Sequence, residues 1–166
     1  MTLKIKVIQS KDRPFISEIV KKLWGDEIII VHGEIFQTST LDGLKALLND
    51  QIIGFLHYQC RTDECEIITL ASLVEGQGVG SALIEVIERI TLENGCRKLS
   101  VITTNDNLHA LGFYQRRGFH LAALFSGSIN SSRKIKPAIP AIGENNIPIR
   151  DELCLEKTLL KDAFRT

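Results

Sequence analysis

The 166-residue sequence has no excess of charge of either sign, because 20 Lys and Arg residues balance 20 Asp and Glu residues. Without a basic excess the chain lacks the electrostatic footprint that holds a polyanion, so we expect no nucleic-acid partner. No apolar run approaches the roughly 20 residues that span a bilayer. The first residues alternate in polarity like a strand and contain no uninterrupted signal-peptide core. We therefore expect no membrane partner and a cytoplasmic location.

Cysteine is scarce, and its spacing is uninformative about metals. Cys60, Cys65, Cys96 and Cys154 form no C-x-x-C pair and no zinc-ligand pattern, so no metal site is predicted. Cys60 and Cys65 flank a predicted hairpin turn at residues 61–64 and could face each other. Disulfides rarely persist in a reducing cytosol, so we expect all four cysteines to serve as small apolar side chains.

Apolar residues make up 44% of the chain and charged residues 24%, the balance of a soluble globular protein with a substantial core. The length suits one domain, and neither a linker nor an internal repeat interrupts residues 1–166. Hydrophobic periodicity predicts an α/β domain. Strands are expected at residues 3–9, 28–31, 43–48, 51–59, 64–73, 97–103, 119–125 and 149–159. Helices are expected from residue 12 to 24, 77 to 94 and 106 to 118.

Local signals support several of these boundaries. Asp12 can cap the first helix, and Gly95 is placed to end the second. The Asn49-Asp50 link is a hairpin signal between two strands. Residues 126–148 form a polar excursion with a short helix expected around residues 129–134, and this segment is a candidate for the substrate side of the molecule.

A glycine-rich turn, Val74-Glu75-Gly76-Gln77-Gly78-Val79-Gly80-Ser81-Ala82-Leu83, connects a buried strand to a helix. The first turn of a helix leaves backbone N–H groups unpaired, and glycines let an anion approach them. The segment lacks the Lys of a nucleotide-hydrolase phosphate loop, and its glycines do not fit G-x-G-x-x-G. It therefore predicts an anion-binding cradle, with a tight connection that binds no ligand as the alternative.

A second segment makes the prediction more specific. Gly78-Val79-Gly80 resembles the end of the Q/R-x-x-G-x-G/A signature of the GNAT superfamily of N-acetyltransferases. Downstream, the run Asn107 to Phe119 resembles that family's N-x-x-A-x-x-F-Y-x-x-x-G-F motif. The element order matches from residue 3 to 159, and the tail resembles a poorly characterised bacterial subgroup. Glu75 departs from the Q/R position, and we expect its carboxylate to point to solvent.

The resemblance implies a fold, a co-substrate and a set of contacts. The fold is a single domain with a central mixed, mostly antiparallel sheet flanked by helices. Acetyl-CoA is the implied co-substrate, and no metal is involved. Its pyrophosphate would bind backbone N–H groups of Gln77, Gly78, Val79, Gly80 and Ser81. Its pantetheine arm would bind along the strand edge at Leu70, Ala71, Ser72 and Leu73, and Asn107 would contact the cofactor.

Two side chains are implied as catalytic. Glu66, at the start of the strand that faces the cofactor, would act as general base on the acceptor amine, and Tyr114 would protonate the departing thiolate. The alternatives are a solvated hairpin charge for Glu66 and a packed aromatic side chain for Tyr114. Among four scattered histidines, His32 lies in the stretch where this family builds its acceptor pocket.

The function implied by the resemblance is transfer of an acetyl group from acetyl-CoA to a primary amine of a small molecule or peptide by direct attack. One alternative is a non-catalytic sensor that binds acyl-CoA through the same cradle. A weaker one is an interaction domain without a ligand. The sequence is compatible with a monomer or a homodimer.

Overall fold

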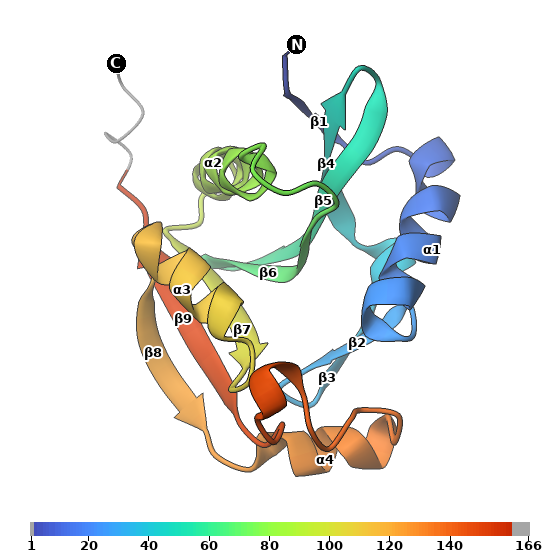
Figure 1. Cartoon of the computed structure of the whole chain (residues 1–166). Coiled ribbons are helices and arrows are strands. Elements are labelled where there is room, and N and C mark those ends of the chain that lie inside the picture. The colour runs from blue at the N-terminus through green and yellow to red at the C-terminus, as the bar shows by residue number, and fades with distance from the viewer. Residues whose placement is uncertain (1, 161–166) are drawn as a thin grey trace.

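The computed structural model describes residues 2–160, so residue 1 and residues 161–166 of the predicted domain lie outside the described chain (Figure 1). The strands are β1 Lys4–Val7, β2 Ile28–Val31, β3 Glu34–Gln37, β4 Asp42–Leu48, β5 Gln51–Arg61, β6 Glu64–Ser72, β7 Lys98–Thr104, β8 His120–Phe125 and β9 Glu152–Thr158. The helices are α1 Arg13–Trp24, α2 Val79–Glu93, α3 Leu108–Arg116 and α4 Ser128–Ile135. Within residues 2–160, no helix combines the length and apolar character that crossing a membrane requires.

Seven strands form one sheet in the order β1-β4-β5-β6-β7-β9-β8, and β2 and β3 form a separate hairpin. Among the described strands, β6 and β7 are the one parallel pair, and every other pairing is antiparallel. The predicted mixed, mostly antiparallel sheet flanked by helices is therefore confirmed.

Each face of the sheet has its own core. Helices α2 and α3 cover one face, here called the α2 face, through side chains such as Leu83, Ile87 and Tyr114. Helix α1 and the β2–β3 hairpin cover the opposite face, the α1 face, through side chains such as Val20 and Phe36. Figure 1 shows α1 and α2 on the two sides of the strands. A residue in a central strand therefore belongs to one core or the other according to its place in the alternation.

Most local signals produced the expected elements. Asn49 and Asp50 both have positive φ, as a two-residue hairpin between β4 and β5 requires. Helix α2 begins just after Gly78 and ends just before Gly95, and α4 forms inside the excursion. Strand β3 was not predicted, because its four residues are too short for periodicity to identify.

Asp12 does not act as the predicted side-chain cap of α1. Its carboxylate instead accepts hydrogen bonds from the Gln9 N–H at 2.8 Å and from the Lys45 ammonium at 2.5 Å. Burial would raise the pKa of Asp12, but these two donors outweigh it and hold the pKa below 3.8. A buried ion pair with β4 thus takes the place of the cap, and it ties the start of α1 to the sheet.

Two of the four cysteines are not free, so the expectation of thiols at Cys60 and Cys65 is wrong. These residues lie directly opposite each other in the β5–β6 ladder, and their sulfur atoms form a disulfide. The predicted hairpin already allowed these two cysteines to face each other, and only the expectation of a reducing compartment favoured free thiols. Cys96 and Cys154 are buried and free, as predicted.

Strand β6 contains a β-bulge that bends it. Tyr58 pairs with Ile67 and His57 pairs with Thr69, which leaves Ile68 as the extra residue. The Thr69 hydroxyl lies 2.7 Å from His57 Nδ1 and accepts the His57 backbone N–H at 3.3 Å. Both side chains are buried, and burial together with Arg13 lowers the pKa of His57 to about 4, which keeps the ring neutral. This polar pair stabilises the bulge from inside the sheet.

We expect Thr69→Val to lower the free energy of unfolding by about 1–3 kcal/mol, because a buried ring nitrogen of His57 loses its partner. Urea unfolding at pH 7 measures the loss. Thr91→Val is the matched control, since the buried Thr91 hydroxyl bonds only the Ile87 carbonyl one helical turn earlier in α2. Equal losses in the two variants would contradict the role assigned to the bulge.

Candidate active site

The parallel strands β6 and β7 separate soon after they meet. Their pairing runs from Glu64 opposite Lys98 to Ile67 opposite Val101 and stops where the bulge begins. Beyond that point a cleft of about 980 Å³ lies between the strands. It is lined from β6 by residues 67–72, from β7 by residues 101–103, and from the glycine-rich turn and α3 by the residues described below. Divergence of the two strands therefore opens the sheet itself.

The predicted strand edge faces this cleft. Leu70, Ala71 and Ser72 line it, and because β5 occupies their other side, their edge toward β7 has no strand partner. An extended chain could pair with that edge through backbone hydrogen bonds. Leu73, also predicted to bind the cofactor, does not line the cleft, and its N–H donates instead to the Ile53 carbonyl at 2.9 Å.

The glycine-rich turn forms one end of the cleft. Gly76 and Gly78 have φ values of 70° and 68°, a left-handed conformation that glycine adopts without strain. The first helical bond of α2 runs from the Ala82 N–H to the Gly78 carbonyl, so the preceding three N–H groups have no partner within the helix. Gly78, Val79, Gly80 and Ser81 line the cleft, and their binding of an anion stays a prediction.

Two other members of the turn behave differently. Gln77, predicted to bind the cofactor, is exposed and does not line the cleft. Glu75 is exposed, as expected, although it lies at the cleft rim. The departure from the family signature therefore places a solvated carboxylate at the edge of the cradle rather than within it.

The cradle is held in place by close packing that only glycine permits. A Cβ on Gly80 would lie 2.8 Å from the Phe113 ring of α3, and a Cβ on Gly54 of β5 would overlap the Val79 side chain at the start of α2. Helix α2 can therefore press its first turn between β5 and α3. Gly80 therefore both exposes the backbone at the start of α2 and allows α3 to approach α2 closely.

The second motif lies across the cleft on α3. Asn107 lines the cleft and caps the helix, because its Oδ1 accepts the Ala110 N–H at 3.1 Å. Tyr114 also lines the cleft, and its ring packs edge-on against Phe113 and Phe119 with centroids 5.2 Å away in each case. Within residues 2–160 the Tyr114 side chain makes no hydrogen bond, and burial raises its pKa above the ordinary value. The phenol is therefore a protonated donor at the cleft wall.

Arg117 is a cationic residue that the sequence motif did not identify. Its guanidinium donates to the Ser81 hydroxyl at 2.5 Å and to the Phe113 carbonyl at 2.9 Å, and it lies 3.5 Å from the centre of the Phe113 ring. It lines the cleft beside the cradle. The residue occupies a variable position of the second motif, so only its contact with Ser81 distinguishes it from a surface arginine.

Glu66 lies on the other side of the sheet from the cradle. Its neighbours Cys65 and Ile67 belong to the α2-face core, so the Glu66 side chain points to the α1 face. It does not line the cleft, but it directly precedes Ile67, where the lining begins. In the described chain, its carboxylate has no ion pair or hydrogen bond. Burial, followed by the nearby Glu34 and Glu64 carboxylates, raises the pKa of Glu66 to about 7.

The surroundings of Glu66 are acidic, and their cations are already engaged. Arg61 forms an ion pair with Glu34, which is itself beside Glu66. Lys98 bridges Glu64 at 3.0 Å and Glu156 at 3.2 Å. This part of the α1 face therefore favours a positively charged group.

The excursion at residues 126–148 borders the same region. The Lys136 ammonium donates to the Trp24 and Ile28 carbonyls at 2.9 and 3.1 Å, which attaches the excursion to the end of α1. Trp24 and Glu144 both line the cleft. His32, at the β2–β3 turn, stacks on Phe125 with centroids 3.8 Å apart, and its backbone N–H donates to Glu152. The excursion and the β2–β3 hairpin thus lie along the α1-face approach.

Comparisons with known proteins agree with this architecture. The model of the Acetyltransferase (GNAT) family matches residues 13–119. YxbD of Bacillus subtilis (strain 168) is 43% identical over 148 residues, covering 89% of this chain and 93% of YxbD. YdhI of the same organism is 37% identical over 145 residues, covering 87% and 91%.

A GNAT family acetyltransferase from Elizabethkingia anophelis, solved with acetyl-CoA bound, has the same fold. It superposes with a TM-score of 0.71 at 20% identity, covering 95% of this chain and 98% of that chain. The resemblance found in the two motifs is thereby confirmed over the whole fold, and the bacterial relatives agree with the predicted subgroup. The chain belongs to the GNAT family of acyl-CoA-dependent N-acetyltransferases.

Proposed function

We propose that this enzyme transfers the acetyl group of acetyl-CoA to a primary amine of a small molecule or peptide by direct attack. The observation that carries the proposal is the cleft, which joins an anion cradle, an unpaired strand edge and the Tyr114 phenol. In this arrangement the N–H groups at the start of α2 bind the pyrophosphate, and the edge at residues 70–72 pairs with the pantetheine arm.

Arg117 supplies positive charge at the cradle. Glu75 at the rim repels a diphosphate, whereas the Arg117 guanidinium, held beside Ser81, attracts it. Arg117 thus supplies the positive charge that the glycine-rich turn itself lacks.

Glu66 is the proposed general base. An alkyl ammonium with a pKa near 10.4 costs about 4.6 kcal/mol to deprotonate at pH 7. A carboxyl group whose pKa is raised to about 7 is partly ionised at that pH and accepts the proton, directly or through one water. The neutral amine then attacks the thioester carbon, and its nitrogen loses the remaining extra proton to solvent. The tetrahedral intermediate breaks its C–S bond, and Tyr114 protonates the departing thiolate and regains a proton from solvent.

The acidic surroundings of Glu66 favour an acceptor that carries positive charge. Arg61 and Lys98 are occupied by carboxylates, so the net field near Glu66 comes from acidic groups. We propose that the excursion at residues 126–148 lies on this acceptor side. A panel of amines, assayed by release of free CoA thiol, tests the activity. Binding of acetyl-CoA without turnover on any amine would favour the non-catalytic sensor instead.

The pH dependence of kcat/KM provides a test of Glu66. Because the ionised form is the base, the rate rises with pH through a midpoint of about 7. Glu66→Gln removes this limb and lowers kcat/KM by about 100-fold. The carboxyl pKa is raised on folding, so ionisation destabilises the fold increasingly above pH 4.5 and fully above about pH 7. Glu66→Gln therefore stays folded at pH 8, with a Tm no lower than that of the wild type.

Glu64→Gln is the matched control from the same strand. It removes a carboxylate that raises the pKa of Glu66, so the midpoint moves to lower pH while kcat stays within a few-fold. A Glu66→Gln profile that keeps the wild-type limb would exclude Glu66 as the base.

Tyr114→Phe keeps the aromatic packing and removes the proton donor. We expect kcat to fall by about 100-fold, while the Kd for acetyl-CoA changes less than about threefold. Steady-state kinetics and calorimetry separate the two effects. Phe119→Leu, which alters the same aromatic cluster without touching a phenol, is the control. An unchanged kcat in Tyr114→Phe would eliminate the proposed acid role.

Arg117→Ala tests the charge at the cradle. Loss of a guanidinium beside the pyrophosphate should weaken acetyl-CoA binding about tenfold, an effect that shrinks at high salt. Calorimetric Kd values at two ionic strengths measure it. Arg89→Ala on the exposed middle of α2 should leave the Kd unchanged. Equal Kd values for the Arg117 and Arg89 variants would remove Arg117 from the site.

A further inference from the structure

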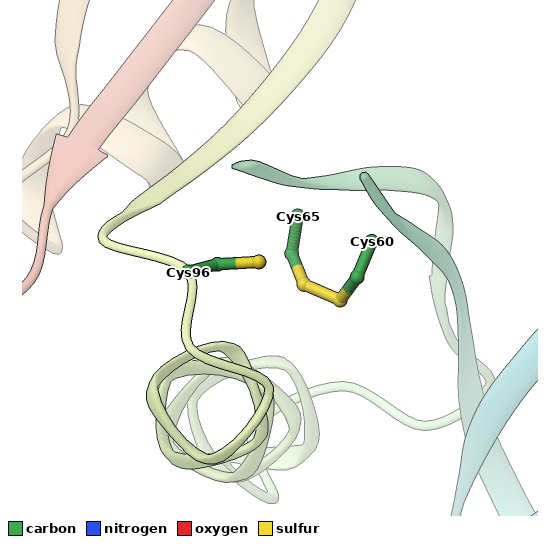
Figure 2. A group of neighbouring side chains, drawn as sticks. All are labelled: Cys60, Cys65 and Cys96. Carbon is green, nitrogen blue, oxygen red and sulfur yellow. A yellow bond between two sulfur atoms is a disulfide. The ribbon is translucent and has the colours of Figure 1, made fainter. Parts of the chain in front are cut away.

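Three cysteine sulfurs from separate segments meet away from the cleft (Figure 2). Cys60 comes from β5, Cys65 from β6, and Cys96 from the loop between α2 and β7. Their Sγ atoms all lie within 4.8 Å of one another. Figure 2 shows the Cys96 side chain directed at the Cys60–Cys65 disulfide from across a short gap. The third thiol thus faces a bond that involves only the other two.

The cluster lies in apolar surroundings. Cys65 and Cys96 are 0% and 2% exposed and belong to the core on the α2 face, with Cys60 packed half-buried against the same cluster. The core side chains of the α2 face therefore largely shield the three sulfurs from solvent.

A structural crosslink alone does not account for this arrangement. Residues 60 and 65 are already opposite in the ladder, and the flanking Arg61–Glu64 pair closes the same turn. A disulfide across a hairpin that pairing has already closed removes little further chain entropy. Cys96 is not part of this hairpin. A hydrogen bond from its backbone N–H to the Thr91 carbonyl at 3.0 Å holds it at the end of α2.

We propose that Cys60, Cys65 and Cys96, with the disulfide reduced, bind one soft metal ion. A thiol reductant supplies the two electrons and two protons that convert the disulfide into two thiols, and each sulfur releases its proton on binding the ion. Metal–sulfur bonds of about 2.3 Å separate ligand sulfurs by about 3.8–4.0 Å. The separations in the cluster are compatible with this value after small side-chain rotations. The disulfide is the oxidised, metal-free state of the same three sulfurs.

The ligand set favours copper(I). Thiolates select soft ions, and the cluster found among residues 2–160 contains no fourth His, Cys, Asp or Glu ligand. Structural zinc sites take four protein ligands, whereas three sulfurs alone match a three-coordinate copper(I) ion. The site is independent of the acetyl-transfer chemistry proposed above.

The experiment titrates the reduced full-length protein with copper(I) under anaerobic conditions against a competing chelator. We expect one equivalent bound, thiolate-to-metal absorption in the near ultraviolet, and three sulfur neighbours by X-ray absorption. Cys96→Ala should weaken binding by more than about 100-fold. Cys154→Ala is the matched control, because Cys154 is also buried and free but lies outside the cluster, and it should bind like the wild type.

Several outcomes would overturn the proposal. These are absence of binding by the reduced wild type, two sulfur neighbours instead of three, or equal affinity in the Cys96 and Cys154 variants. A parallel zinc titration tests the ion, and tighter retention of zinc than of copper(I) would overturn that assignment. The sulfur count on the wild type keeps the test decisive even if Cys96→Ala folds poorly.

Discussion

Everything at the candidate active site depends on the separation of β6 from β7. A parallel pair normally continues until one strand ends, but here it stops after four residue pairs. The bulge at Ile68 follows at once, and a bulge bends and twists the strand that carries it. The Thr69 hydroxyl and the neutral His57 ring stabilise that bend in a buried position. A polar contact inside the sheet thus creates both the opening and the free strand edge.

The opening has chemical consequences because it connects two faces with opposite electrostatics. On the α2 face, unpaired N–H groups and Arg117 attract anions, and the Tyr114 phenol stays protonated. On the α1 face, Glu66 lies among carboxylates and attracts a cation. Because the sheet opens where the β6–β7 pairing ends at Ile67, the proposed thioester on one face and the proposed acceptor amine on the other would meet there. Burial, together with the Glu34 and Glu64 carboxylates, raises the pKa of Glu66 to about 7.

Local patterns in the sequence were sufficient for most of the elements and for the glycine-rich turn. The Asn49-Asp50 turn, the glycines around α2 and the helical stripe of α3 depend on neighbouring residues, so they can be predicted without a partner strand. The bulge could not, because an extra residue exists only relative to the strand opposite it. The same holds for the Cys60–Cys65 disulfide, for Arg117 beside Ser81, and for the Lys45 partner that diverts Asp12 from capping. Leu73 and Gln77 were included by continuity along the chain, which ignores where a strand leaves the cleft.

The glycines at the cradle also explain why the fold is compatible with Glu at position 75, where the family signature has Gln or Arg. Gly80 and Gly54 let the first turn of α2 pack closely against α3 and β5, so the position of its N–H groups does not depend on the side chain at position 75. Glu75 is exposed and bears no part of that packing. Its carboxylate therefore acts on a bound anion only through its electric field, and solvent screens that field. The Arg117 guanidinium, which is hydrogen-bonded to Ser81 in the cradle, opposes the same field. Geometry and charge at this site come from different residues, and the charge can change while the geometry stays.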